Sequence, residues 1–185
     1  NGLSTYTFEV DEANNELQLT APAATFVRIN EVDAQNPSTD SEEFIELYDG
    51  GVGNTSLDGL VVVLFNGGAT DDVSYNAIDL SGHSTDANGF FVIGSSSVAN
   101  VDLIEFTTNG LQNGADAVAL YEGSAADFPN GTAPTATNLI DAVVYDDDVS
   151  DDAALIAILT PGQAQINEDA NGDAENHSIA RVPNG

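Results

Sequence analysis

Apolar and polar residues alternate with a period of two through most of the chain, and this pattern restricts the fold more than any other feature. The segment TYTFEV places Tyr6, Phe8 and Val10 on one face and polar residues on the other. The segment ELQLT repeats the alternation after the turn-forming sequence DEANN. Because successive side chains of a strand point to opposite faces, residues 1–25 are predicted to contain a β-hairpin.

Further short strands are predicted along the rest of the chain, separated by clusters of Gly, Asn, Asp and Ser. They are FVRINEVD from Phe26, EEFIELYD from Glu42, LVVVLF from Leu60, SYNAIDL from Ser74, FFVIG from Phe90, VDLIEF from Val101, AVALYEG from Ala117, LIDAVVYD from Leu139 and SIARVP from Ser178. Many short strands at this spacing are typical of an all-β sandwich or barrel. LVVVLF is apolar throughout, so we expect it to be buried on both faces.

One segment, SDDAALIAILTPG, has a different pattern. Ser150 is a good helix N-cap, Asp151 and Asp152 suit the first turn, and Pro161 would end the element. The segment is either a short helix or a loop packed on the sandwich. The sequence TAPAAT before Phe26 is the one seam, so we divide the chain into a hairpin extension (1–25) and a sandwich (26–185).

The charge of the chain is extreme. The sequence contains 31 Asp and Glu residues but two basic residues, Arg28 and Arg181, so its net charge is −29. A nucleic-acid binder needs a basic surface, an anionic membrane would repel this chain, and a Walker-type phosphate loop needs a lysine. Self-repulsion of this size destabilises a compact state unless salt or divalent cations screen it.

The composition also bears on where the protein works. The chain has no Cys, does not open on Met, and contains no long apolar run of the kind that spans a membrane. We expect a mature extracellular protein, secreted or on the cell surface. A fragment of a longer protein, or a salt-adapted cytoplasmic protein, is the alternative.

From Phe26 onward the chain contains VRINEVDAQNPSTDSEEFIELYDGG, followed by SLDGLVVVLFNGG. FFVIGSS, LQNGADAVALYEG, IDAVVYDDD and SIARVPNG come later in the chain. These segments and their order resemble the lamin tail domain family, and the resemblance extends from Phe26 to the end of the chain. The resemblance implies an immunoglobulin-like β-sandwich.

The resemblance also implies a kind of function. In bacteria such domains occur in secreted and surface proteins, often beside nucleases or phosphatases, as modules without catalytic activity of their own. This chain contains no such catalytic neighbour, so the activity of an enzyme is not carried over to it.

Three glutamates alternate with apolar residues in the predicted strands: Glu31, Glu43 and Glu46. A carboxylate on an apolar face must be paired or hydrogen-bonded. Arg28 and Arg181 are the only strongly cationic partners in the chain. We predict that at least one arginine pairs with one of these glutamates as a structural clasp; the alternative is that the glutamates point to solvent at strand ends.

The residues do not form a recognisable catalytic motif. The two histidines, His83 and His177, lie in different predicted loops, and GSSSV lacks the second glycine of a G-x-S-x-G elbow. With no Cys and two separated His, a zinc site would depend on carboxylates. We therefore expect surface histidines and no enzymatic activity.

Acidic clusters raise the possibility of bound calcium, which prefers six to eight oxygen ligands. The first set of candidate ligands is Asp146, Asp147, Asp148, Asp151 and Asp152, and the second is Asp169, Asn171, Asp173 and Glu175 in NEDANGDAENHS. When positions are counted from Asn167, the second set fits a calcium-binding loop up to the twelfth position. Ser178 occupies that position, where a bidentate glutamate is required. Each cluster is also explained as a solvated acidic face or a polar turn.

Two functions remain open. In the first, the strand with Tyr6, Phe8 and Val10 leaves its own subunit, completes a neighbour's sheet and builds a filament that calcium or salt stabilises. In the second, the chain is a monomeric binding or targeting module of a secreted nuclease or phosphatase. No nucleic-acid partner and no membrane insertion is expected in either case.

Overall fold

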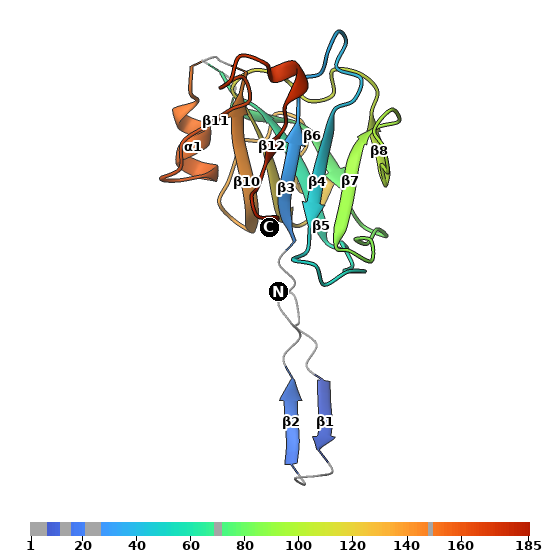
Figure 1. Cartoon of the computed structure of the whole chain (residues 1–185). Coiled ribbons are helices and arrows are strands. Elements are labelled where there is room, and N and C mark those ends of the chain that lie inside the picture. The colour runs from blue at the N-terminus through green and yellow to red at the C-terminus, as the bar shows by residue number, and fades with distance from the viewer. Residues whose placement is uncertain (1–6, 12–15, 21–26, 69–71, 148–149) are drawn as a thin grey trace.

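Two five-stranded β-sheets form the body of the molecule (Figure 1). The computed structural model describes residues 7–11, 16–20, 27–68, 72–147 and 150–185, and for the first two ranges it gives the strands and their pairing only. One sheet has the order β12-β3-β4-β7-β8 and the other has the order β11-β10-β9-β5-β6. The β7–β8 and β10–β11 pairs are parallel and the other pairs are antiparallel.

The strands agree with the predicted segments to within two residues at each end, except that the last strand ends at Ala180, three residues before the end of the predicted segment SIARVP. In the first sheet they are β3 (Arg28–Asp33), β4 (Phe44–Tyr48), β7 (Phe90–Ser95), β8 (Leu103–Phe106) and β12 (Ile179–Ala180). In the second they are β5 (Leu60–Asn66), β6 (Val73–Asp79), β9 (Asp116–Glu122), β10 (Leu139–Asp146) and β11 (Ile166–Asn167). The short strand β11 was not predicted.

The main core lies between the two sheets, and a second core covers the outer face of one of them. In β5, Val62 and Leu64 belong to the core between the sheets. Val61, Val63 and Phe65 belong to the second cluster, which includes side chains of the helix α1 (Ala153–Leu159). The side chains from Val61 to Phe65 are all fully buried, because both faces of this strand are covered. The continuous apolar run LVVVLF predicted this burial.

Helix α1 begins two residues later than the sequence pattern indicated. Asp152, not Ser150, is the N-cap, and its carboxylate accepts hydrogen bonds from the backbone N–H groups of Ala154 and Leu155. The chain leaves the helix at Thr160, just before Pro161. A carboxylate suits the N-cap because it complements both the unpaired N–H groups and the positive end of the helix dipole.

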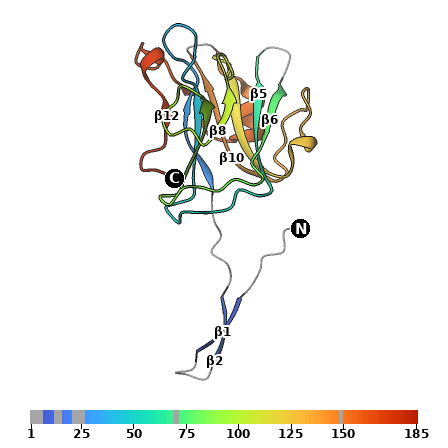
Figure 2. The ribbon, with the colours of Figure 1, turned by 90° about the vertical axis from the view of Figure 1, so that its right-hand side faces the viewer.

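The N-terminal hairpin is a separate two-stranded sheet. Its strands β1 (Thr7–Asp11) and β2 (Glu16–Thr20) pair antiparallel, with Phe8 opposite Leu19 and Val10 opposite Leu17. Two views at right angles show the hairpin apart from the sandwich (Figures 1 and 2). Tyr6 and residues 21–25 of the seam TAPAAT lie outside the described residues.

The structure therefore confirms an all-β sandwich with an added hairpin. Within the described ranges, no helix combines the length and the apolar character needed to cross a membrane.

Candidate functional site

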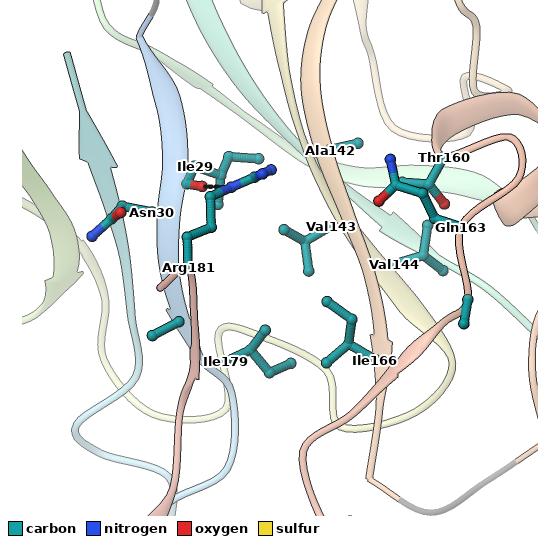
Figure 3. Close-up of a pocket in the computed structure, with 12 residues that line it drawn as sticks. Ile29, Asn30, Ala142, Val143, Val144, Thr160, Gln163, Ile166, Ile179 and Arg181 are labelled. Atoms are coloured by element: carbon teal, nitrogen blue, oxygen red, sulfur yellow. Dashed lines mark hydrogen bonds between the residues drawn. The ribbon is translucent and has the colours of Figure 1, made fainter. Parts of the chain in front are cut away.

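A slot with a cavity of about 90 Å³ opens between the two sheets on the side of β10 and β12 (Figure 3). Val143 of β10, Ile166 of β11 and Ile179 of β12 lie around its centre. Other lining residues come from β3, from β10, from the segment after α1, and from the end of β12 and the residue after it: Ile29, Asn30, Ala142, Val144, Thr160, Gln163, Ala164, Ala180 and Arg181. The slot is therefore mostly apolar, with a few polar groups on its walls.

An ion pair joins the two sheets beside this slot. Arg181 Nη2 lies 2.8 Å from Asp141 Oδ1, and Arg181 Nε donates to the Ile29 carbonyl at 2.7 Å. Asp141 Oδ2 accepts the backbone N–H of Ile29 at 3.0 Å. Asp141 belongs to β10 and Ile29 to β3, so one carboxylate and one guanidinium connect strands of different sheets.

Burial raises the pKa of Asp141, and the charges of Arg181 and Arg28 offset part of that increase. Both basic residues of the chain therefore act on this one carboxylate. The side chain of Arg181 is 35 % exposed and that of Asp141 is 14 % exposed, so the pair sits at the boundary of the core.

Arg181 therefore pairs with an aspartate, whereas the sequence prediction was that at least one of the two arginines pairs with Glu31, Glu43 or Glu46. The predicted glutamates are satisfied in other ways. Glu43 is fully buried and accepts the N–H groups of Gly110 at 2.6 Å and Leu111 at 2.9 Å. Glu46 accepts from Asn30 Nδ2 at 2.8 Å, and Glu31 accepts from the Ser178 hydroxyl. For Arg28, pairing with one of these glutamates stays a prediction. The bonds of Glu43, Glu46 and Glu31 show that amide and hydroxyl donors, which the prediction did not consider, satisfy such carboxylates.

Thr160 contributes an unusual polar atom to the slot. The residue is buried, and among the described atoms its Oγ1 has no hydrogen-bond partner. A buried hydroxyl without a partner costs free energy, and such groups are uncommon in folded proteins. The slot therefore presents one unused hydrogen-bonding group next to an apolar lining.

An acidic hollow of about 620 Å³ covers part of the outer face of the β3–β4–β7 sheet. Its lining includes the apolar residues Phe44, Val92 and Val98. Five carboxylates also line it: Glu31, Asp33, Glu42, Glu46 and Glu175. The hollow combines negative charge with apolar surface, which is the chemistry that a cationic, partly apolar ligand would match.

Carboxylates in and near this hollow resist ionisation. Burial, with smaller contributions from Glu31, Glu43 and Glu42, raises the pKa of Asp33 to about 7. Burial also raises the pKa of Glu46, and the charge of Glu31 adds to it. A raised pKa means that the folded protein disfavours the charged form of these groups.

The first set of predicted metal ligands is dispersed by the fold. Asp146 is buried and accepts a hydrogen bond from Gln165, Asp152 caps α1, and Asp151 is exposed to solvent. Asp148 lies outside the described residues. The acidic run is therefore divided between a strand end and a helix N-terminus.

The second set is partly brought together. Asp169, Asp173 and Glu175 line a hollow of about 310 Å³ with Asp147 from the first set. Asn171 does not line it and is exposed in the adjoining turn. Across the described ranges, no group of three or more His, Cys, Asp or Glu side chains has the geometry to hold a metal ion.

Hydrogen bonds within NEDANGDAENHS agree with the interpretation as a polar turn. Asn167 Oδ1 accepts the N–H of Asp169 at 2.7 Å, and Asp169 Oδ1 accepts the N–H of Ala174 at 3.1 Å. Asp173 Oδ1 accepts from Asn176 Nδ2 at 2.6 Å. Several of the oxygens that would bind calcium are thus already used as acceptors within the loop.

The two histidines lie in different parts of the fold. His83 is half-buried with its ring 5.3 Å from the ring of Phe91. His177 is exposed, immediately after the short 3₁₀ helix η2 (Ala174–Asn176).

Two structurally important carboxylates were missed by sequence reasoning. Asp141 interrupts the apolar strand LIDAVV, and the argument applied to the glutamates would have selected it. Asp49 precedes two glycines, a signal for a turn closed by its side chain. Asp49 accepts hydrogen bonds of 2.6–3.0 Å from Gly51, Val52, Gly53, Thr55 and Thr85.

Comparisons of the chain with protein-family models, with curated proteins and with solved structures return no significant match. The resemblance to the lamin tail domain therefore rests on the order of the sequence motifs and is a proposal about ancestry.

Proposed function

We propose that this chain is an extracellular, non-catalytic structural or cell-surface protein whose subunits associate through the hairpin β1–β2. The observation that carries the proposal is the separation of this hairpin from the sandwich (Figures 1 and 2). A two-stranded hairpin alone is at best marginally stable in water. Addition to the sheet of another subunit would supply the main-chain and apolar contacts that the hairpin lacks.

The apolar residues of the hairpin support this role. The sequence places Tyr6, Phe8 and Val10 at alternate positions, and the register sets Phe8 against Leu19 and Val10 against Leu17. A strand with alternate apolar positions is suited to β-augmentation, because the main chain supplies affinity and the alternate side chains set the register.

Head-to-tail transfer of a hairpin gives an assembly that need not close. When each subunit donates one element and receives another, the contact is heterologous and repeats along a filament unless the rotation closes a ring. Each subunit carries a charge of −29, so association also requires that salt or calcium screen the repulsion. Such a dependence suits a salty or calcium-rich exterior, and it is compatible with a lamin-tail-like, immunoglobulin-like sandwich as the repeating body.

Deletion of residues 1–25 tests the proposal. The full chain should form large oligomers or filaments in 0.5 M NaCl, measured by light scattering after gel filtration and by electron microscopy. The shortened chain should be a folded monomer. A full-length double variant, Phe8→Asp with Val10→Asp, should also be monomeric, while Thr7→Ser with Gln18→Asn should assemble normally. A full chain that is monomeric at every salt and calcium concentration would refute the proposal.

A second candidate function is a monomeric binding module, and the acidic hollow on β3, β4 and β7 favours it. Its five carboxylates and apolar lining residues match a cationic ligand with apolar groups. Calorimetry with a lysine- and leucine-rich peptide should then show binding that Glu42→Gln with Glu46→Gln weakens, in a chain that stays monomeric. Glu105→Gln with Glu122→Gln, both away from the hollow, is the matched control.

A further inference from the structure

The edges of the two sheets differ in what covers them. On the side of β10 and β12, Asp141 and Arg181 bond both main-chain groups of Ile29, which closes the gap between the sheets. On β6, the N–H and the carbonyl of Ser74 are both bonded to the segment 131–132, each at 2.8 Å. These main-chain groups are therefore not available to a further strand.

The edge of β8 is open by comparison. This strand ends the sheet β12-β3-β4-β7-β8 on the side of the molecule away from α1 (Figure 1), and β7 is its one strand partner among the described residues. Ile104 of β8 is 60 % exposed, the largest exposed fraction of a large apolar residue in the ten strands of the sandwich. Because unpaired strand edges readily accept a further strand, β8 is the edge best placed to receive one.

A row of neighbouring residues on the outer face of this sheet ends at Ile104. The register places Phe44 of β4 beside Gly94 of β7, and Gly94 beside Ile104 of β8. Side-chain atoms of Phe44 and Val98 lie 3.1 and 3.3 Å from where a Cβ of Gly94 would be, so they cover the glycine. Side chains in such cross-strand rows stabilise a sheet by contact. The next place in the row, beyond Ile104, belongs to a strand that the described part of the subunit does not supply.

The hairpin of a second copy has the side chains that this row lacks. Phe8 and Val10 of β1 lie opposite Leu19 and Leu17 of β2, so one face of the hairpin carries four apolar side chains. Addition of a hairpin strand to β8 places one of these side chains beside Ile104, on the outer face. The same step pairs the main chains of both partners, which supplies affinity, while the alternate side chains set the register.

Charge makes this contact depend on salt. Asp102 and Glu105 lie at β8, and the hairpin strands contain Glu9, Asp11 and Glu16. These carboxylates repel one another, and the repulsion between exposed charges decreases as salt shortens the screening length. Apolar contact and main-chain pairing therefore determine the association at high salt, in agreement with the salt dependence of the proposed function.

We infer that the free edge of β8 is the receiving site for the β1–β2 hairpin of a second copy of this chain. This inference rests on the proposed function and adds the location of the acceptor. The hairpin continues the sheet beyond β8, and its apolar face covers Ile104. The edge of β6 and the side of β10 and β12 are then not acceptors.

Cysteine cross-linking tests the location, because the chain has no cysteine of its own. Full-length chains with Thr7→Cys, Glu9→Cys or Gln18→Cys supply the hairpin, and each keeps the four apolar side chains. A chain with Glu105→Cys supplies β8. Asp79→Cys is the matched control, since Asp79 is also an exposed acid of an edge strand, β6. Equimolar mixtures are assembled in NaCl and mildly oxidised, and disulfides between the two kinds of chain are identified by mass spectrometry.

The expected result is a mixed disulfide to Glu105→Cys that is about tenfold more abundant than that to Asp79→Cys, because contact in the assembly raises the effective concentration of the thiols. Assembly with preferred cross-linking to Asp79→Cys, or with no preference, would overturn the acceptor site and leave the proposed function standing. If the unaltered chain does not assemble at any salt concentration, the proposed function fails and the inference fails with it.

A polar substitution at the edge provides a second measurement. Ile104→Asn should raise the concentration needed for assembly by about tenfold or more, because it removes an apolar side chain that assembly buries. Ile166→Asn is the control, since Ile166 is a 44 % exposed isoleucine of the edge strand β11. Both variants should keep the circular dichroism and melting temperature of the parent. Equal assembly by the two folded variants would contradict the inference.

Discussion

Arg181 and Asp141 connect the two sheets of the sandwich, because their ion pair also satisfies the backbone of Ile29. The Asp141 carboxylate accepts a hydrogen bond from the Ile29 N–H, and the Arg181 guanidinium donates one to the Ile29 carbonyl. The ion pair therefore bonds both main-chain polar groups of one residue of β3. Asp141→Ala should lower the free energy of unfolding by about 2–3 kcal/mol, since it leaves a charge and an N–H without partners.

Urea denaturation measures this change. Asp151→Ala serves as the control, since Asp151 is an exposed acid beyond the end of the same strand. The control should change the free energy of unfolding by less than about 0.5 kcal/mol. Similar values for the two variants would show that the connection contributes nothing to stability.

The stability of the protein should increase as the pH falls from 8 to 5. Burial raises the pKa of Glu168 to about 8, that of Glu43 to about 7 and that of Asp116 to about 6. For an acid whose pKa is higher in the folded state, the folded protein binds more protons, so its contribution to stability is complete below the unfolded pKa and is lost as the pH rises through the folded pKa. Melting temperatures at constant ionic strength should show this rise, and a flat profile would contradict it.

Glu168→Gln should stabilise the protein at pH 8 and have less effect at pH 5. The substitution removes a buried charge, and the amide oxygen of glutamine can still accept the N–H of Ala34. We expect the melting temperature at pH 8 to rise by about 2–4 °C, or about 1 kcal/mol for a chain of this length. The exposed Glu175→Gln is the control. An equal shift in both variants would mean that general charge reduction, not burial, is responsible.

Asp49 should be essential to the loop that follows β4. Burial alone would raise the pKa of Asp49, but hydrogen bonds from Thr55, Thr85 and the N–H groups of Gly53 and Val52 lower it below its ordinary value. This contribution to stability is present above the unfolded pKa and is lost as the pH falls through the folded pKa.

Asp49→Ala should destabilise the fold by about 2–4 kcal/mol, because several buried donors lose one shared acceptor. Amide hydrogen exchange of Val52 and Gly53 should accelerate in the same variant. Asp86→Ala, in an exposed turn with a similar pattern of backbone contacts, should cost less. Unchanged exchange at Val52 and Gly53 would show that the loop does not depend on Asp49.

Salt should promote folding and assembly by screening, and calcium should act like magnesium. The oxygens of Asp169 and Asp173 already accept hydrogen bonds within their loop, so a calcium ion there would have to compete with them. Melting and light scattering in NaCl, MgCl₂ and CaCl₂ at matched ionic strength make the comparison. An effect specific to calcium that Asp169→Asn abolishes would instead establish a calcium site in that loop.

Thr160→Val should be neutral or stabilising by about 1 kcal/mol in the monomeric form. The substitution keeps the shape of the side chain and removes a buried hydroxyl that has no partner among the described atoms. Thr85→Val is the control and should be destabilising, because the Thr85 hydroxyl donates to Asp49 at 2.7 Å. Destabilisation of Thr160→Val comparable to that of the control would show that its hydroxyl is bonded in solution.

The hydrogen-bond partners of charged side chains were the least predictable part of the structure. Glu43 was identified from the sequence as a carboxylate among apolar residues, but its donors, Gly110 and Leu111, lie more than sixty residues further along the chain. Arg181 was one of two arginines considered as partners for the glutamates, but it pairs with Asp141. Such partners depend on which strands become neighbours, and alternation within a strand carries no information about that.

The sequence by itself determined that the chain is all-β, that an N-terminal hairpin precedes the sandwich, and that the surface carries a large negative charge. These follow from period-two alternation, turn residues and composition, which are local or summed properties of the chain. Only the tertiary structure decided that β10 and β3 meet at Asp141 and Arg181, that the acidic run at 146–152 is divided between a strand and a helix cap, and that a slot opens beside β12. The physical reason is that these features come from long-range packing of strands, which brings together residues that the sequence keeps far apart.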